Sequence, residues 1–208
     1  MRKPAIHKNI IAAAAVLALA LASPAVLASG ADELVQLRIK SDHKNAVVEI
    51  PLPVLEFLQK HDVGKKIDAG EVHGRRIHVS LDQIMKALKD TRAKGGETLL
   101  MKVEEPGETT TIFLAVATDA SSRPGKTPTT VVLTAKDPHK DGPTRITVPL
   151  STVDMLVGSL KIEGDDGEGH GHDPMPLFRD LLSFARDMGT GLLARVQSDD
   201  GEVVLELQ

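Results

Sequence analysis

The segment of this chain that is best suited to metal chemistry runs from Glu163 to Asp173 and reads EGDDGEGHGHD. Carboxylate oxygens are suitable ligands for Ca²⁺ or Mn²⁺, and imidazoles suit Zn²⁺, Cu²⁺ or Ni²⁺. The glycines between them would let the backbone wrap around an ion. The candidate metal ligands are Asp165, Asp166, Glu168, His170, His172 and Asp173.

Two interpretations of this segment stay open. Its spacing does not match an EF-hand, because no D-x-[DN]-x-[DN]-G run is closed by a glutamate at the twelfth position. His170 and His172 would point to opposite sides of an extended chain, so they could chelate one ion only if the loop bends. The segment is therefore either a divalent-metal site or a solvated acidic loop between two helices. We expect no other cofactor.

Histidines and serines elsewhere do not match a known catalytic pattern. His43-Lys44 and His139-Lys140 each lie in a polar turn between two strand-like runs, where such residues are common. The chain has no G-x-S-x-G elbow, no S-x-x-K run and no P-loop. We therefore predict a protein that is not an enzyme and has no catalytic residues. A hydrolase with a non-standard site would need His78 or His139 beside a carboxylate and a serine.

The elements that would position these residues occur twice along the chain. Residues 37–58 and 132–156 each contain a β-rich run, a His-Lys turn and a second β-rich run. Both second runs end in a similar tripeptide, Ile50-Pro51-Leu52 or Val148-Pro149-Leu150, and lead into a short apolar helix pattern. The pattern predicts an internal repeat.

The second part of each copy is also similar. Residues 80–113 and 176–207 each read as a helix, a glycine stop and two strands. Ser80 and Gln83 predict a capping box at the first of these helices, and Gly189 predicts the end of the second. The basic stretch between the two helices of the first copy, Lys65 to Val79, is interpreted as a solvated linker.

From these patterns we predict an α+β fold built from two tandem copies of a β-hairpin, short helix, helix, β-hairpin module. The first copy spans residues 31–118 and the second spans residues 129–208. Residues 119–128, with the sequence DASSRPGKTP, form a Ser/Pro/Gly linker between them. The sequence leaves open whether the two copies share one sheet or form separate lobes.

The first 28 residues predict a signal peptide. Three basic residues precede an apolar run from Ile10 to Ala22, and small residues lead to expected cleavage after Ala28, with Ala25 as the second choice. An uncleaved anchor is the alternative. Removing the three basic residues of this segment leaves 22 basic against 29 acidic residues. We therefore expect a periplasmic or secreted protein without a stable membrane span.

Composition excludes several classes of protein. The chain has 208 residues and no Cys, Trp or Tyr, so a disulfide scaffold and a thiolate metal site are excluded. The negative net charge argues against a protein that binds the phosphate backbone of nucleic acids. Only four aromatic residues are present, so the stacking surfaces typical of single-strand binders are missing as well.

The strand, charged turn and Ile50-Pro51-Leu52-Pro53 phrase of residues 37–58 resemble a module of bacterial SHOCT-like proteins of the YvlB type. Val148-Pro149-Leu150-Ser151 looks closer still to the family's phrase, and residues 81–90 with 99–114 look like its capped helix and terminal hairpin. The resemblance covers about two-thirds of the mature chain. It implies a role in the bacterial envelope without catalysis, and it transfers no functional residue.

Together these observations predict an exported bacterial protein that acts by protein–protein interaction in the cell envelope. The expected partners are envelope proteins rather than nucleic acids. The alternative function is periplasmic metal binding through residues 163–173.

Overall fold

The computed structural model describes residues 33–42, 44–61, 66–72, 75–105, 108–118, 126–159 and 174–208. Within these ranges the chain forms ten strands and four helices. In chain order they are β1 (Glu33–Ser41), β2 (Asn45–Pro51), α2 (Leu52–Lys60), β3 (Lys66–Val72), β4 (Arg75–Ser80), α3 (Leu81–Lys94), β5 (Thr98–Glu105), β6 (Glu108–Thr118), β7 (Thr130–Lys136), β8 (Thr144–Pro149), α4 (Leu150–Ser159), α5 (Pro174–Met188), β9 (Gly191–Ser198) and β10 (Gly201–Leu207).

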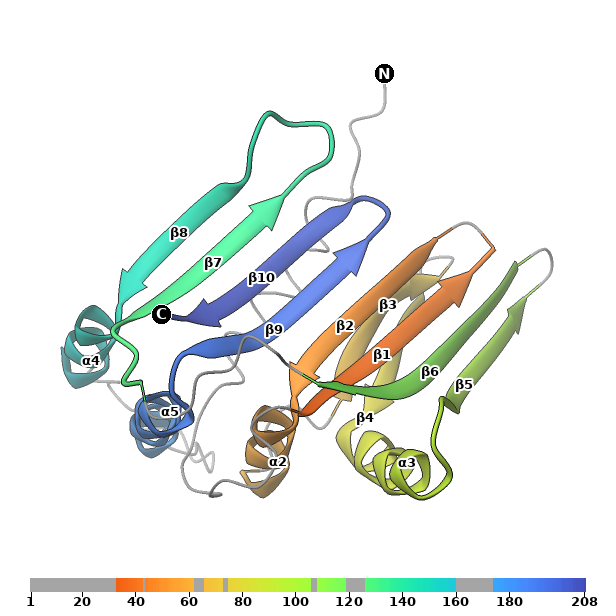
Figure 1. The fold of residues 1–208 in the computed structure, drawn as a ribbon, viewed down its shortest axis with the longest axis horizontal. Coiled ribbons are helices and arrows are strands. Elements are labelled where there is room, and N and C mark those ends of the chain that lie inside the picture. The colour runs from red at the N-terminus through yellow and green to blue at the C-terminus, as the bar shows by residue number, and fades with distance from the viewer. Residues whose placement is uncertain are drawn as a thin grey trace, which may run out of the picture.

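Eight strands form one antiparallel sheet in the order β5-β6-β1-β2-β9-β10-β7-β8. Figure 1 shows the sheet with α4, α5, α2 and α3 in a row at one end of its strands. The centre of the sheet is the pairing of β2 with β9, which places Ala46 opposite Ser198 and Glu49 opposite Arg195. The two parts of the chain therefore share one sheet.

This topology shows that the predicted α+β fold of two tandem modules is wrong. The hairpins exist, but the pairing of β2 with β9 merges them into one large sheet, and strands outweigh helices in the described residues. The physical reason is that a hairpin has unpaired backbone groups along its outer edges, and a second hairpin can satisfy them. Local sequence patterns predict each hairpin but carry no signal for this long-range pairing.

The residues between α2 and α3 also differ from their prediction. Lys66–Val72 and Arg75–Ser80 pair as a separate two-stranded sheet, where the sequence suggested a solvated linker. Figure 1 shows this hairpin behind β1 and β2. The side chain of Val79 on β4 is only 1% exposed and belongs to the main hydrophobic core. The hairpin therefore helps to cover the sheet.

The core lies between one face of the sheet and the elements that cover it. Side chains alternate along a strand, so Val35 and Leu37 of β1 face the same side as Ile112 and Leu114 of β6. Five of the nine residues of helix α2 are buried in this core. Its buried side chains are Leu52, Val54, Leu55, Phe57 and Leu58.

The predicted ends of the two longer helices are confirmed. The Ser80 hydroxyl accepts a hydrogen bond from the backbone N–H of Gln83, and the Gln83 side chain accepts one from the backbone N–H of Ser80, which completes the capping box. Helix α5 ends at Met188, and Gly189 follows with a φ of 80°, a conformation that glycine adopts without strain. These caps fix where α3 begins and where α5 ends.

The two halves of the sheet have the same strand order. In each, the hairpin that comes later in the chain stands before the earlier one in the strand order, as β5-β6-β1-β2 and β9-β10-β7-β8. Both β5 and β9 also carry a bulge at the same place in a Leu-Leu sequence, at Leu100 and at Leu193. A bulge kinks its strand and increases the local twist, so β5 and β9 share this distortion.

Candidate functional site

The predicted metal ligands lie outside the described residues. Asp165, Asp166, Glu168, His170, His172 and Asp173 all belong to the segment between α4 and α5 that the structure does not describe. Among the described residues, no group of three or more His, Asp or Glu side chains could hold a metal ion. Metal binding at residues 163–173 stays a prediction, which calorimetry on metal-free protein and on the double variant His170→Ala, His172→Ala can test.

The His-Lys turn between β7 and β8 is held by local hydrogen bonds. The backbone N–H of His139 donates to Oδ1 of Asp137 at 2.9 Å, and Lys140 Nζ lies 3.7 Å from the same carboxylate. The side chains of His139 and Lys140 are exposed. The contacts are those of a turn in which an aspartate caps its own backbone. His43, the corresponding residue of the first turn, lies outside the described residues.

A continuous polar network crosses the junction of the two halves on the sheet face opposite the core. Gln36 Nε2 donates to Glu49 Oε1 at 2.6 Å, and Arg195 donates to Glu49 Oε2 at 2.9 Å. Arg195 Nε also lies 3.5 Å from Glu202 Oε1. These residues come from β1, β2, β9 and β10, so the network spans four neighbouring strands.

The Glu49 carboxylate is at the centre of this network, and its side chain is only 13% exposed. Charge-assisted hydrogen bonds with a partly buried carboxylate are stronger than exposed ion pairs. The network therefore fixes the register in which β2 meets β9. Sequence analysis missed it, although Glu49 and Arg195 stand out as single charges within apolar strands.

The turns at the same junction are joined as well. Lys44 Nζ lies 2.9 Å from Asp200 Oδ2, and the backbone N–H of Asn45 donates to Asp199 Oδ2 at 2.9 Å. Thus the β9–β10 turn presents carboxylates to the β1–β2 turn. The junction combines backbone pairing, one face network and one contact between turns.

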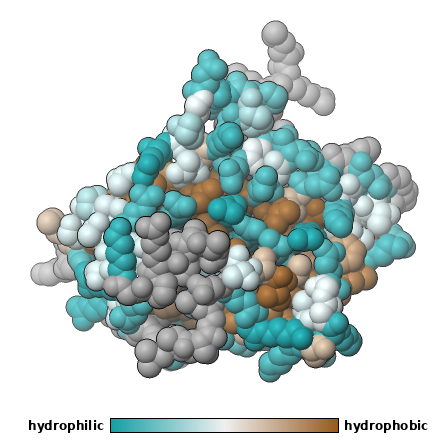
Figure 2. Space-filling view, in the orientation of Figure 1, coloured by the Kyte–Doolittle hydropathy of each residue, from teal (hydrophilic) through white to brown (hydrophobic). Residues whose placement is uncertain are grey.

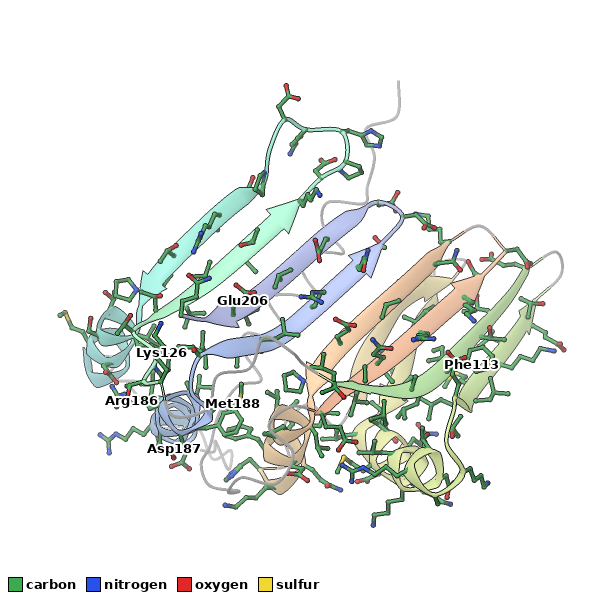
Figure 3. All side chains as sticks on the ribbon, in the orientation of Figure 1. Phe113, Lys126, Arg186, Asp187, Met188 and Glu206 are labelled. Atoms are coloured by element: carbon green, nitrogen blue, oxygen red, sulfur yellow. The ribbon has the colours of Figure 1, made fainter. Side chains whose placement is uncertain are left out.

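The face that carries the network is of mixed polarity. In Figure 2 hydrophilic side chains lie between apolar patches across the visible face of the sheet. Figure 3 labels Phe113 on β6 and Glu206 on β10, which belong to different halves of the sheet. The ammonium of Lys40 lies 5.2 Å from the centre of the Phe113 ring, within reach of a cation–π contact.

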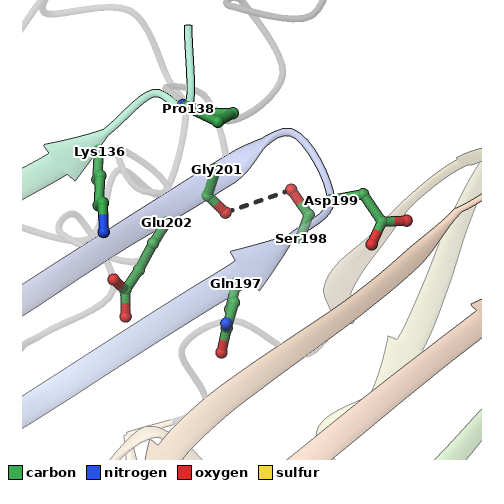
Figure 4. A pocket seen from close by; sticks show the side chains of 7 residues that line it. All are labelled: Lys136, Pro138, Gln197, Ser198, Asp199, Gly201 and Glu202. Atoms are coloured by element: carbon green, nitrogen blue, oxygen red, sulfur yellow. Dashed lines mark hydrogen bonds between the residues drawn. The ribbon is translucent and has the colours of Figure 1, made fainter. Parts of the chain in front are cut away.

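A shallow depression of about 180 Å³ lies where β7 meets the β9–β10 turn. Figure 4 shows its lining. The lining residues are Lys136, Pro138, Gln197, Ser198, Asp199, Gly201 and Glu202. The Ser198 hydroxyl accepts from the backbone N–H of Asp200 at 3.3 Å and lies 3.5 Å from the carbonyl oxygen of Gly201. Ser198 therefore holds the turn and is not arranged as a nucleophile.

The outermost strands β5 and β8 are the free edges of the sheet, since each has a strand neighbour on one side only within the described residues. Strand β8 is exposed over nearly its whole length, and Ile146 at its centre is 52% exposed. Leu99 on β5 is also 52% exposed. An open edge offers unpaired N–H and C=O groups, which can hydrogen-bond to another extended chain.

Comparison with protein-family models, with curated proteins and with solved structures finds no match for this chain. The resemblance to SHOCT-like modules therefore stays a prediction. Among the described residues, none of the helices is long and apolar enough to cross a membrane. The geometry of the sheet edges is the observation from which a function can be argued.

Proposed function

We propose that this chain is an exported bacterial protein without catalytic activity, which acts by protein–protein interaction in the cell envelope through the edges of its sheet. The observation that carries the proposal is the open edge at β8. The predicted signal peptide supports the location in the envelope. The side chains of Asp137 and Ser198 accept hydrogen bonds from the backbone of their own turns, and this structural use of polar groups supports a binding role rather than a catalytic one.

Strand β8 lacks two of the devices that keep sheet edges from pairing, since it carries neither a lysine nor a bulge. Natural edges are protected by lysines, prolines, bulges or short length. Strand β5 carries both Lys102 and the bulge at Leu100. Strand β8 pairs with β7 without a bulge, and its prolines stand only before its first residue and at its last position. Within the described residues, no strand pairs with the outer side of the stretch from Arg145 to Val148.

The side chains of β8 define the partner it would bind. Ile146 lies on the same sheet side as the core residues, whereas Arg145 and Thr147 point to the polar face. An added strand would place one residue opposite each of these. The occupant is therefore an extended segment of alternating polarity, with an apolar residue opposite Ile146 and an acidic residue opposite Arg145.

The proposal can be tested by photo-crosslinking in intact cells. A photoreactive amino acid replaces Ile146 on β8 or the exposed Lys89 on α3, a helix that packs against β5 and β6 at the opposite end of the sheet from β8 (Figure 1). We expect the 146 variant to link to one envelope polypeptide, and mass spectrometry to locate the link in one extended alternating segment. Equal crosslinking from positions 146 and 89, or links scattered over many unrelated proteins, would contradict the proposal.

A further inference from the structure

The junction between β2 and β9 shows how one edge of this fold recognises another. Four pairs of opposed residues make up the junction, from Ala46 with Ser198 to Glu49 with Arg195. In the middle, Val48 lies opposite Val196 on the core side. One ion pair on the polar face and one contact between turns accompany the backbone pairing.

The free edge β8 is the counterpart of β2. Both strands follow their partner in a hairpin, and both end in a proline that is followed by a leucine at the start of a helix. Pro51 of β2 lies opposite Leu34, and Pro149 of β8 lies opposite Thr130. Within each half of the sheet, this strand occupies the same edge.

The other free edge, β5, is the counterpart of β9. Both strands follow a long helix, both form a hairpin with the next strand, and both carry the bulge at Leu100 or Leu193. The internal junction therefore joins a β8-like edge to a β5-like edge. The two free edges of one molecule, β8 and β5, are therefore the counterparts of the two strands that pair at the internal junction.

We propose that β8 of one copy of this chain pairs antiparallel with β5 of a second copy, in the register of the internal junction. This inference rests on the proposed function, because it names the occupant of the β8 edge. Transfer of the register places Arg145 opposite Glu104, Ile146 opposite Val103 and Thr147 opposite Lys102.

The side chains at these positions complement one another. Arg145 and Glu104 are exposed and carry opposite charges, and they would take the places of Val47 and Gln197, on the same face as the junction's pair of Glu49 with Arg195. Ile146 and Val103 would repeat the contact of Val48 with Val196 and would cover the exposed half of the Ile146 side chain. Charge and hydropathy therefore both favour this register.

Pairing of two different edges is a head-to-tail contact. Such an interface leaves one β8 and one β5 free at the ends of every assembly, so copies add until a ring closes or a filament grows. The occupant is a second copy of this chain, and the product is a sheet that continues from one molecule into the next.

Cysteine crosslinking tests the register directly, since the chain contains no cysteine of its own. Variants Ile146→Cys and Val103→Cys are purified separately, checked for folding by circular dichroism, mixed and oxidised. Directly opposed residues in a sheet bring their Cβ atoms close enough for a disulfide, whereas a shift of two residues does not. The control mixes Ile146→Cys with Met101→Cys, which lies two residues from Val103.

We expect the 146–103 mixture to give roughly tenfold more disulfide-linked dimer than the control mixture. Equal yields, or links only between two copies of the same variant, would overturn the head-to-tail register. If Val103→Cys does not fold, charge exchange replaces it. Arg145→Glu and Glu104→Arg should each sediment as monomers, and their mixture should regain dimer through the complementary edges of the two variants. A mixture that stays monomeric overturns the inference.

A failure of self-association can be distinguished from a failure of the proposed function. If the copies do not pair but position 146 still crosslinks to an extended segment of another envelope protein in cells, self-association is wrong and the proposed function stands. If position 146 crosslinks to nothing beyond the Lys89 control, both are wrong.

Discussion

Gly201 is the residue on which the geometry of the β9–β10 turn depends most. Its φ is 143°, and a Cβ atom placed on it would lie 2.4 Å from the carbonyl oxygen of Lys136 on the neighbouring strand. No side chain fits at that distance without moving backbone. Glycine is therefore required both by its conformation and by the closeness of β7.

We predict that Gly201→Ala lowers the free energy of unfolding by about 2–3 kcal/mol. The matched control is Gly142→Ala, because Gly142 has a φ of 86° but a Cβ atom placed on it would meet nothing within 4 Å. Its cost should be about 1 kcal/mol, from backbone conformation alone. Urea unfolding measures both free energies. Equal losses in the two variants would show that the close contact with Lys136 adds nothing to the cost of replacing Gly201.

His61 gives the fold a dependence on pH. Burial lowers the pKa of its imidazole below 6.5, the positive charge of Lys60 lowers it further, and Asp180 opposes these effects. The ring lies 5.2 Å from that of Phe57, and its Nε2 atom is buried. The folded protein thus favours the neutral imidazole.

Stability should therefore decrease as the pH falls through 6.5, because the unfolded chain then binds a proton that the folded chain does not. The loss should level off below the pKa of the folded protein. We predict that His61→Leu shows a smaller loss between about pH 7.5 and pH 5 than the wild type. Thermal unfolding across this range measures the effect, with His139→Leu as a control for removal of an exposed imidazole. Identical slopes in His61→Leu and the wild type would contradict the assignment.

At the scale of elements, helix α3 depends on its capping box. Ser80 and Gln83 satisfy backbone groups that the first turn of a helix leaves unpaired. We predict that Ser80→Ala lowers the free energy of unfolding by about 1 kcal/mol. Urea unfolding of Ser80→Ala, with the exposed Lys89→Ala as control, measures the loss. A stability equal to that of the control would mean that packing of α3 alone fixes its start.

The sequence predicted the elements whose signals are local. The Ser80 cap, the Gly189 stop and the Asp199-Asp200 turn are each specified by a few neighbouring residues. The hairpin of β3 and β4 was missed because its strands are rich in polar residues. The pairing of β2 with β9 was missed because it joins residues far apart in the chain, and the sequence of neither strand indicates which strand it pairs with.

The candidate site was missed for the same physical reason. An open edge is a property of the whole sheet, so β8 could be recognised only after its place in the strand order was known. The residues that sequence analysis favoured, from Asp165 to Asp173, lie outside the described residues, and their metal binding is still a prediction. Sequence patterns reveal unusual residue types. Whether a strand forms an edge depends on which strands pair with it, and a local pattern does not contain that information.

At the scale of the whole molecule, the described residues leave both edges of the sheet unpaired, and the internal junction provides a template for joining them. The junction has backbone pairing, a partly buried ion pair and a contact between turns. The free edges offer opposite charges at Arg145 and Glu104 and apolar residues at Ile146 and Val103. Assembly through these edges is the central claim, and it concerns the residues that follow the predicted signal peptide.

Sedimentation velocity of the mature chain over a series of concentrations tests this claim most directly. The wild type should shift from monomer to dimer and larger species as concentration rises. The variant Ile146→Lys places a charge opposite Val103 and should stay monomeric, whereas Met155→Lys, which changes an exposed residue of α4, should associate like the wild type. A wild type that remains monomeric at every concentration, or an Ile146→Lys variant that associates equally well, would contradict the account.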